Sequence, residues 1–447
     1  MIRFISTRGG CSAVGASAAL LSGLAPDGGL YVPERLPALE LAALDPGLSF
    51  PRRAALALAP FFMGDPLEGE IGRLCDEAFD FPLPLAAPDG EREPLRVLEL
   101  FHGPTAAFKD FGARFLARAM ERLERRAADP HADPLADPAA ASAASSLGGP
   151  LTILVATSGD TGGAVAAAFH RRPGLAVRVL FPQGGVSPRQ KRQLTCWGGN
   201  VSSYEVRGSF DDCQRLVKAA FRDESLARRY RLSSANSINL GRLLPQMAYY
   251  VHASALYRAE LGASPSLVIP SGNLGNALGA FWARAMGAPI DRIVMASNAN
   301  RALPDFFSDG AYRPRPSVPT IANAMDVGDP SNMERLRALY PGFEALKAGA
   351  AAYSVGDEEL RAQIRRRWER SGYLICPHTA AADRVYEERL AGRPAVVVAT
   401  AHPAKFETVV EPIIGSAASV PPALSALLEA PSAYETIAPE LAALFPG

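Results

Sequence analysis

The sequence contains no run of 18 or more apolar residues, so no segment predicts a helix that could span a membrane. No apolar stretch follows a basic N-terminus, so a secretory signal peptide is not predicted. Basic and acidic residues number 46 each, which leaves neither a broad basic field for nucleic acid nor a polybasic membrane anchor. We therefore expect a cytoplasmic globular protein that binds neither a membrane nor nucleic acid.

The cysteines and histidines also lack the spacings of known structural sites. Five cysteines are scattered along the chain without a Cys-x-x-Cys pair, and six histidines form no His-Glu-x-x-His cluster. Neither a disulfide framework nor a metal site is predicted. The nucleotide signatures Gly-x4-Gly-Lys-Ser/Thr and Gly-x-Gly-x-x-Gly are missing too, which argues against an NTPase or a dinucleotide-binding fold.

The length of 447 residues indicates two or three domains rather than one core. Residues 1–95 are rich in proline and glycine turns and predict a small α+β region that opens with an edge strand. We expect residues 96–245 to form a small α/β domain around Lys109, and residues 246–447 to form a large α/β domain with C-terminal helices. Residues 127–150 lack periodicity and predict a flexible surface insertion without a chemical role.

Short apolar runs alternate with helical segments over most of the chain. These strand-like runs are residues 152–156, 176–181, 266–270, 292–296 and 395–399. The alternation predicts an α/β fold whose parallel sheets are covered by helices on both faces.

The segment 99–112 places Lys109 in the first turn of an amphipathic helix, behind the Gly103-Pro104 turn and between two phenylalanines. The positive end of the helix dipole and the apolar neighbours both disfavour the ammonium form, so the pKa of Lys109 is expected to fall. A Schiff-base lysine needs this, because only the neutral amine attacks a carbonyl. By spacing alone, an ordinary surface lysine fits equally well.

Two glycine-rich segments each leave a predicted strand and enter a predicted helix. In residues 267–276, Gly272 and Gly275 allow positive φ, and Asn273 or Asn276 can add donors, which together predict a phosphate cradle. A tight turn that binds nothing is the alternative. Residues 154–163 repeat this plan, with hydroxyls and glycines around Asp160, which could also simply cap the helix. Two cradles and a candidate Schiff-base lysine indicate two anions, one from a cofactor and one from a substrate.

The chain resembles the threonine synthase family, pyridoxal-phosphate enzymes of fold type II, the tryptophan-synthase β-like fold. The segments that carry the resemblance are residues 7–9, 27–33, 101–112, 156–162, 234–239, 323–327 and 400–406. The longer bacterial and fungal subgroup, with its extra N-terminal domain, is the most similar. This resemblance implies two parallel-sheet α/β domains plus the N-terminal region, with pyridoxal 5'-phosphate bound by residues 246–447. Leu274 departs from the family, which more often has an aromatic residue there.

The resemblance also implies roles for individual residues. Lys109 would be the catalytic residue and would hold the cofactor. Thr400 would hydrogen-bond the pyridine nitrogen, although it could be an ordinary strand-end residue. The cofactor phosphate would be held by Gly272, Asn273, Leu274, Gly275 and Asn276. The substrate would be bound by Ser158, Gly159, Asp160, Thr161, Asn236 and Arg242.

Some of these residues have plainer alternatives. Arg242 suits a phosphate because a guanidinium can bind it through two donors. Equally, Asn236 and Arg242 could merely cap and solvate the helix that begins near residue 240. His102 and Asp110 are expected only to support Lys109.

The implied reaction converts O-phospho-L-homoserine and water to L-threonine and phosphate. An alternative with the same cofactor is a phospho-lyase or dehydratase that releases a 2-oxo acid and ammonia. A ligand-binding descendant without activity is disfavoured, because Lys109, both turns and Thr400 are all present. We expect a monomer, with a dimer as the alternative.

Overall fold

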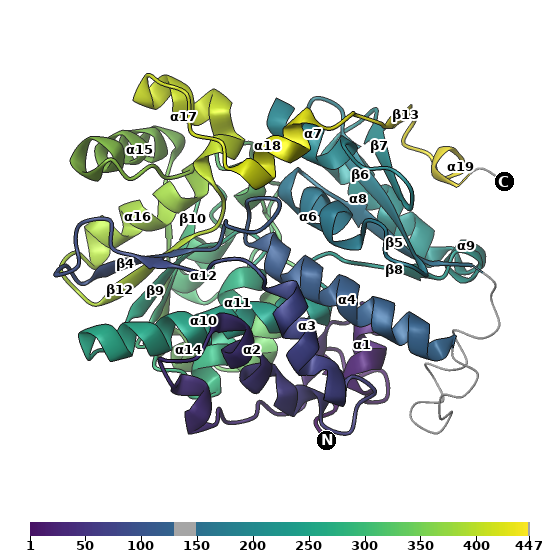
Figure 1. The fold of residues 1–447 in the computed structure, drawn as a ribbon, viewed down its shortest axis with the longest axis horizontal. Coiled ribbons are helices and arrows are strands. Elements are labelled where there is room, and N and C mark those ends of the chain that lie inside the picture. The colour runs from purple at the N-terminus through teal and green to yellow at the C-terminus, as the bar shows by residue number, and fades with distance from the viewer. Residues whose placement is uncertain (129–148, 446–447) are drawn as a thin grey trace.

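The computed structural model describes residues 1–128 and 149–445, which form three sheets surrounded by helices (Figure 1). The α/β class is confirmed. Among the described strands of the two larger sheets, every pair is parallel except the short edge pair β3–β4. The predicted insertion at 127–150 falls almost wholly outside the described residues, so its flexibility stays a prediction.

The largest sheet has the strand order β11–β10–β9–β12–β4–β3. Its strands are β3 (Leu85–Ala86), β4 (Leu95–Glu99), β9 (Ser266–Pro270), β10 (Ile293–Ser297), β11 (Ala350–Ser354) and β12 (Ala395–Ala399). The predicted runs at 266–270, 292–296 and 395–399 are confirmed within one residue as β9, β10 and β12. These runs are apolar throughout because helices cover both faces of the sheet. Alternate residues face the α10–α11 side and the α15–α16 side.

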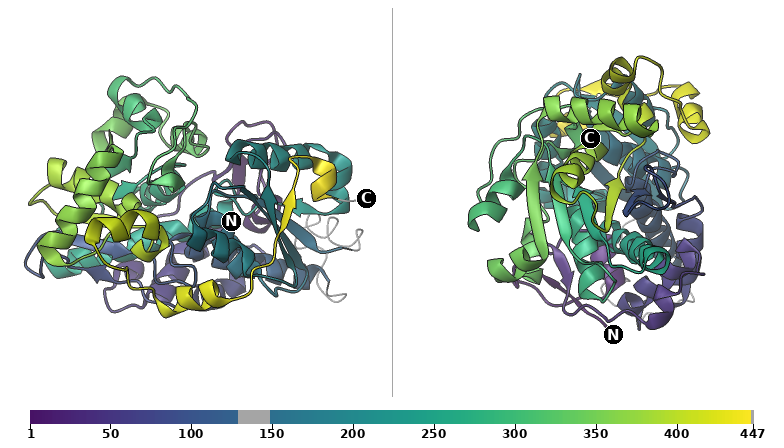
Figure 2. Two further views of the ribbon diagram at one scale, coloured as in Figure 1. Left: turned by 90° about the horizontal axis from the view of Figure 1, so that it is seen from above. Right: turned by 90° about the vertical axis from the view of Figure 1, so that its left-hand side faces the viewer.

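The second sheet has the order β13–β7–β6–β5–β8 and lies beside the first (Figure 2). Its strands are β5 (Leu151–Ala156), β6 (Leu175–Pro182), β7 (Val201–Val206), β8 (Leu232–Ser233) and β13 (Glu435–Ile437). The predicted runs at 152–156 and 176–181 are confirmed as β5 and β6. Helix α6 (Asp160–Phe169) packs on one face and α8 (Phe210–Arg222) on the other.

Helix α10 (Leu240–Leu261) is buried along most of its length between these layers. Such all-round burial is typical of a core helix. It packs against α2 (Phe50–Leu58), α4 (Lys109–Ala127) and α11 (Gly275–Ala285). A Cβ atom at Gly112 would lie 2.6 Å from the carbonyl oxygen of Arg242, so only glycine allows this contact between the first turns of α4 and α10. The crossing therefore brings Arg242 close to the helix start that carries Lys109.

The N-terminal region opens with β1 (Phe4–Ser6), which pairs antiparallel with β2 (Tyr31–Pro33). The predicted edge strand is thus confirmed in a separate two-stranded sheet. Helices α1 (Ala16–Ser22) and α3 (Ile71–Ala78) complete this region with α2. The three domain boundaries stay predictions.

The C-terminal segment crosses from one large sheet to the other (Figure 1). It contains α17 (Glu407–Ile414), α18 (Pro422–Glu429) and α19 (Leu441–Leu444), of which the last two match the expected C-terminal helices. However, residues 435–437 form β13, an edge strand beside β7, where only helices were expected. Two of its three residues are exposed, so the strand has little apolar signal of its own.

The remaining helices surround these layers. They are α7 (Pro188–Thr195), α9 (Glu224–Arg229), α12 (Ala302–Asp309), α13 (Met333–Leu339), α14 (Phe343–Gly349), α15 (Asp357–Ser371) and α16 (Pro377–Arg389). Short 3-10 turns occur at Leu41–Leu44, Ala59–Phe62, Glu68–Glu70, Asn323–Met325 and Pro403–Phe406. None of the helices in the described part of the chain is long and apolar enough to cross a membrane.

Candidate active site

The segments singled out by sequence meet at the carboxyl ends of the parallel strands, the edge where open α/β sheets bind ligands. The turn at 157–161 follows β5, the turn at 271–276 follows β9, and Thr400 follows β12. The backbone N–H of Phe108 donates to the carbonyl oxygen of Thr400 at 2.8 Å. This bond holds the residue before Lys109 against the end of β12.

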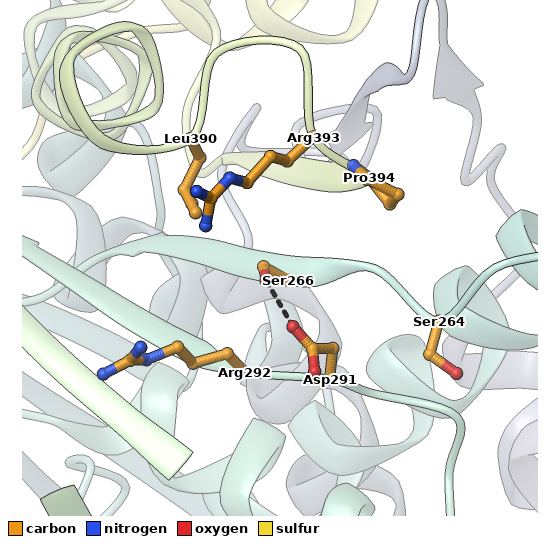
Figure 3. A pocket seen from close by; sticks show the side chains of 7 residues that line it. All are labelled: Ser264, Ser266, Asp291, Arg292, Leu390, Arg393 and Pro394. Atoms are coloured by element: carbon orange, nitrogen blue, oxygen red, sulfur yellow. Dashed lines mark hydrogen bonds between the residues drawn. The ribbon is translucent and has the colours of Figure 1, made fainter. Parts of the chain in front are cut away.

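A hollow of about 200 Å³ lies at the opposite edge, by the amino ends of β9, β10 and β12 (Figure 3). It is lined by Ser264, Ser266, Asp291, Arg292, Leu390, Arg393 and Pro394, and Ser266 donates to Asp291 at 3.0 Å. None of these residues belongs to a motif singled out by sequence. We therefore place the candidate site at the carboxyl edge.

Lys109 is the first residue of α4, and its side chain is half-buried with its Nζ 5.8 Å from the centre of the Phe108 ring. Burial lowers the pKa of Lys109 to about 8. The carboxylate of Asp160 opposes this change, whereas the positive charges of Lys405 and Arg242 add to it. A substantial fraction of the amine is therefore neutral near physiological pH, as a carbonyl-attacking lysine requires.

Asp160 forms a buried ion pair with Lys405. Its Oδ1 lies 2.8 Å from Lys405 Nζ and accepts a second bond from Gln190 Nε2 at 3.2 Å. Burial alone would raise the pKa of the Asp160 carboxyl, but the ammonium groups of Lys405 and Lys109 hold it well below its usual range. The interpretation of Asp160 as a helix cap is wrong. Gly159 occupies the cap position of α6, and the Asp160 carboxylate points to Lys405 instead.

The turn from Thr157 to Gly162 is partly closed by its own hydroxyl. Thr157 Oγ1 accepts from the N–H groups of Gly159 at 3.0 Å and Gly162 at 2.9 Å. Gly159 has φ 133°, and a Cβ there would lie 2.7 Å from the Gln190 side chain, so this position requires glycine. The hydroxyls of Ser158 and Thr161 keep some exposure and make no hydrogen bond to any described residue. They remain available to a ligand.

The turn from Ser271 to Asn276 has more free donors. Among described residues, none accepts a hydrogen bond from the backbone N–H groups of Gly272 through Asn276. Two side-chain atoms, Asn276 Nδ2 and Ser271 Oγ, are buried without a partner in the described structure. Asn276 Oδ1 accepts from the hydroxyls of Tyr249 and Tyr250, the latter at 2.6 Å. These contacts orient the free Nδ2 of Asn276.

Gly272 and Gly275 allow positive φ, but neither takes it in the structure. Leu274 is the residue in the left-handed conformation, with φ 62°. Gly272 is needed for a different reason, since a Cβ there would lie 2.8 Å from the Cα of Met325. Of the two asparagines expected to offer donors, Asn273 already uses its Nδ2 on Ser237 Oγ at 2.8 Å.

Arg242 is buried in the first turn of α10 and donates through Nη1 to the carbonyl oxygen of Ala235. Its Nε has no partner among the described residues, and the same holds for the buried Oδ1 of Asn236. Burial lowers the pKa of Arg242 to about 10, so it stays charged at neutral pH. The helix cap is Asn239, whose side chain accepts from the N–H of Gly241 at 2.8 Å. Asn236 therefore does not cap α10, and Arg242 is not solvated.

The two residues expected to support Lys109 make contacts of that kind. His102 pairs with Glu99 at 2.6 Å. The buried Asp110 accepts from the N–H and the hydroxyl of Thr105, at 2.9 and 2.7 Å. These bonds close the turn that leads into α4.

Three family models match the chain. "Pyridoxal-phosphate dependent enzyme" matches residues 86–401, "Threonine synthase N terminus" residues 3–79, and "Threonine synthase, C-terminal" residues 379–444. The threonine synthase of Escherichia coli K12 is 37% identical over 430 residues, which cover 95% of this chain and 94% of that protein. The chain belongs to the threonine synthase family.

Solved structures of this family superpose closely. The threonine synthase of E. coli has a TM-score of 0.85 at 35% identity, with 99% of this chain and 98% of that chain covered. The pyridoxal-phosphate-bound threonine synthase of Brucella melitensis has a TM-score of 0.87 at 34% identity, covering 99% and 97%. A threonine deaminase of Solanum lycopersicum, at 15% identity and a TM-score of 0.53, shares the fold alone.

Pyridoxal phosphate is the cofactor of the threonine synthase family, and the residues present fit it. The free N–H groups at Gly272–Asn276 and the unpartnered Asn276 Nδ2 are the donors that a phosphate needs. A lysine of lowered pKa lies at the same edge for the carbonyl carbon.

Sequence reasoning missed Lys405 and His378 as members of this site. Lys405 lies within the matching segment 400–406, but nothing local showed its partner on α6. The ring of His378 is buried, and its Nε2 accepts from the N–H of Ala324 at 3.1 Å. Burial lowers the pKa of His378 to about 4 despite the nearby Asp160, so the ring is neutral at physiological pH.

Proposed function

We propose that the chain is a threonine synthase that converts O-phospho-L-homoserine and water to L-threonine and phosphate. The observation that carries this proposal is the position of Lys109, two glycine-rich turns and Thr400 at the carboxyl ends of strands from both large sheets, in a chain of this family. No described group of histidine, cysteine, aspartate or glutamate side chains could hold a metal ion.

The cofactor would be held by two groups of residues. Lys109 would bind its carbonyl carbon, and the hydroxyl of Thr400 would donate to the pyridine nitrogen. The phosphate would lie against the turn formed by Gly272, Asn273, Leu274, Gly275 and Asn276. When bound, pyridoxal phosphate withdraws electrons from the substrate Cα and makes its proton acidic. Thr400 suits this chemistry because, unlike an aspartate, a hydroxyl leaves the ring nitrogen unprotonated.

Lys109 would then serve as the base and acid of the reaction. Its neutral amine would take the Cα proton of the bound substrate, and Cβ would lose a second proton. Phosphate would then leave from Cγ, the two protons would return to Cγ and Cα, and water would add at Cβ. A pKa of about 8 suits these opposite tasks, because both forms of the amine are populated near neutral pH.

The substrate would bind on the other side of Lys109, against Ser158, Gly159, Asp160 and Thr161. Because Lys405 neutralises Asp160, the carboxylate does not repel an anion there. The free hydroxyls of Ser158 and Thr161 can then donate to the substrate. Asn236 and Arg242 would complete the site, with the free Nε of Arg242 as the donor for the leaving phosphate.

An absorbance spectrum paired with a product assay tests this function. Incubation with O-phospho-L-homoserine is expected to yield threonine and phosphate in equal amounts. Borohydride should fix the cofactor covalently to the wild-type chain and not to Lys109→Ala, which should form no threonine. Formation of 2-oxobutyrate and ammonia would favour the phospho-lyase instead. Covalent fixation in Lys109→Ala would show that another residue holds the cofactor.

We further propose that the enzyme is a cytoplasmic monomer. Large apolar side chains that are exposed among the described residues are few: Met1, Ile5, Met63, Val318 and Tyr434. A stable dimer interface usually needs a larger apolar patch. Light scattering on the purified protein should give a mass near 47.3 kDa, and twice that mass would show a dimer.

A further inference from the structure

Lys405 lies at the boundary between the two large sheets, outside the residues assigned so far to cofactor and substrate. It belongs to the short turn Pro403–Phe406 after β12, and its side chain is fully buried. Its Nζ lies 2.8 Å from Asp160 Oδ1 and donates to the carbonyl oxygen of Thr105 at 2.8 Å. Thr105 precedes Lys109 in the same loop, whereas Asp160 starts a helix of the other sheet. One ammonium group therefore joins both sides of the site.

Charged groups from several elements face Lys109. Asp160 of α6 favours its ammonium form, whereas Lys405 and Arg242 of α10 disfavour it. On α16, the ring of His378 is influenced by the charges of both Asp160 and Lys109, and burial keeps it neutral.

The first turn of α4 adds one more buried carboxyl, Asp110. Its carboxylate accepts hydrogen bonds from the N–H and the hydroxyl of Thr105. The cations whose charges act on it are Lys405, Arg114 and Arg242, and not Lys109. Asp160 is therefore the carboxylate that decides whether Lys109 keeps its proton.

We propose that Lys405 is a positioning residue that keeps Asp160 in an ion pair and thereby prevents that carboxylate from holding Lys109 in its charged, unreactive form. A buried carboxylate without a counter-charge is unfavourable, so it recruits the nearest available cation. With Lys405 present, that cation is Lys405. Without it, Lys109 is the remaining ammonium whose charge acts on Asp160. The inference rests on the proposed role of Lys109 in the reaction.

A purely structural tether would make a different prediction. If Lys405 only fastened the two loops together, removing its charge would disturb Lys109 whether or not Asp160 carried a charge. If Lys405 acts through charge balance, removing the Asp160 charge as well should restore the reactivity of Lys109. The double variant Lys405→Met/Asp160→Asn therefore separates the two roles.

The test measures the pH at which Lys109 becomes nucleophilic in the full-length chain freed of cofactor. Trace acetic anhydride labels the amines, and mass spectrometry compares the Lys109 peptide with that of Lys218, an exposed lysine on α8. A one-unit rise in pKa lowers the neutral fraction about tenfold below the midpoint. We expect Lys405→Met to slow Lys109 labelling at pH 7 by about this factor.

The other variants complete the experiment. Lys405→Arg and the double variant should label Lys109 at a rate within about threefold of wild type. This is well short of the roughly tenfold loss that a rise of one pKa unit would cause in Lys405→Met. Lys191→Met removes a lysine of α7 that pairs with Glu205 of β7, and it should not change the labelling rate of Lys109. An unchanged midpoint in folded Lys405→Met would overturn the proposal, as would a double variant that labels as slowly as the single one.

If Lys405→Met does not fold, Lys405→Gln takes its place, because it also removes the charge but keeps an amide donor for the carbonyl oxygen of Thr105. It should slow Lys109 labelling at pH 7, and unchanged or faster labelling would overturn the proposal. Labelling is measured without substrate or cofactor, so its failure is separate from a failure to form threonine. If labelling behaves as expected but no threonine forms, the proposed reaction would be wrong and the charge balance at Lys109 would stand.

Discussion

The two glycine-rich turns share a plan but differ in their charge and in their free donors. Each leads from a buried parallel strand into a helix. The turn at 157–162 contains a charged residue, Asp160, and Thr157 already occupies two of its N–H groups. In the turn at 271–276, no side chain is charged, and the N–H groups of Gly272 through Asn276 have no acceptor among the residues described. Similar local sequences thus produce different electrostatic environments.

This difference suits the two proposed ligands. An uncharged turn rich in free donors can hold a dianionic phosphate that stays in place. A turn whose one charge is balanced by a distant segment, and whose hydroxyls remain free, suits a ligand that must enter and leave. Lys405 allows the turn at 157–162 to bind such a ligand, because it neutralises the Asp160 carboxylate that would otherwise repel an anionic substrate.

The largest expected effect comes from breaking the charge balance of the first turn. Lys405→Met leaves Asp160 buried without its main partner, and loss of one member of a buried pair costs about 3–5 kcal/mol. Urea denaturation should show this fall in the free energy of unfolding. The matched control is Arg228→Met, whose pair with Glu224 at 3.3 Å joins two mostly exposed side chains, and should cost less than about 1 kcal/mol. Equal losses of unfolding free energy in the two variants would show that the buried Lys405–Asp160 pair stabilises the fold no more than an exposed pair.

A second variant introduces a charge into the uncharged turn. Asn276→Asp removes the free Nδ2 donor and adds a negative charge where the cofactor phosphate is proposed to bind. Like charges in contact cost several kcal/mol, so the affinity for pyridoxal phosphate should fall about 100-fold or more. Fluorescence titration measures the dissociation constant. The control is Asn200→Asp. It loses the hydrogen bonds that the Asn200 amide donates to the carbonyl oxygens of Phe169 on α6 and Leu175 on β6, and it should leave the dissociation constant unchanged. Unchanged affinity in Asn276→Asp would place the phosphate elsewhere.

A third, smaller effect distinguishes the two glycines within the second turn. A Cβ at Gly272 would meet the Met325 backbone at 2.8 Å, whereas a Cβ at Gly275 would make only ordinary contacts at 3.5 Å. Gly272→Ala should therefore destabilise the chain by about 1–3 kcal/mol and weaken cofactor binding. Gly275→Ala should stay within about 0.5 kcal/mol of wild type. Thermal denaturation with and without cofactor checks both, and the reverse order would show that Gly275 makes the close contact.

The sequence predicted these turns well because their signals are local. Apolar runs located β5, β6, β9, β10 and β12, and glycines after β5 and β9 located both turns. The missed strands have weaker patterns. β7 reads Val-Ser-Ser-Tyr-Glu-Val, which is not a continuous apolar run, and β11 is mostly alanine, which is depleted in strands. Their assignment depends on pairing with neighbouring strands, which periodicity does not reveal.

The details of the site that were predicted wrongly depend on tertiary contacts. Positive φ falls on Leu274 rather than on a glycine, in a turn that Asn273 fastens to Ser237 and to the N–H of Ser331. The partner of Asp160 lies in a turn after β12, far along the chain. Long-range ion pairs leave no periodic signal. A residue's type and spacing can therefore predict where a site lies, but not which charge balances it.

The smallest expected effect is a pH dependence confined to the charged turn. The pKa of Asp160 is held well below its ordinary value of 3.8 by Lys405 and Lys109, against the effect of burial. A carboxyl with a lowered pKa stabilises the fold above its ordinary value, and this contribution is lost as the pH falls below it. Wild type should therefore exceed Asp160→Asn in unfolding free energy at pH 7, and the difference should shrink at pH 3. Other carboxyls titrate in both chains and cancel. The same comparison with Asn276→Ala should give a difference that does not change between these pH values, because the second turn has no titrating side chain. A constant difference for Asp160→Asn would mean that its charge contributes nothing to stability, and the two turns would then differ only in their donors.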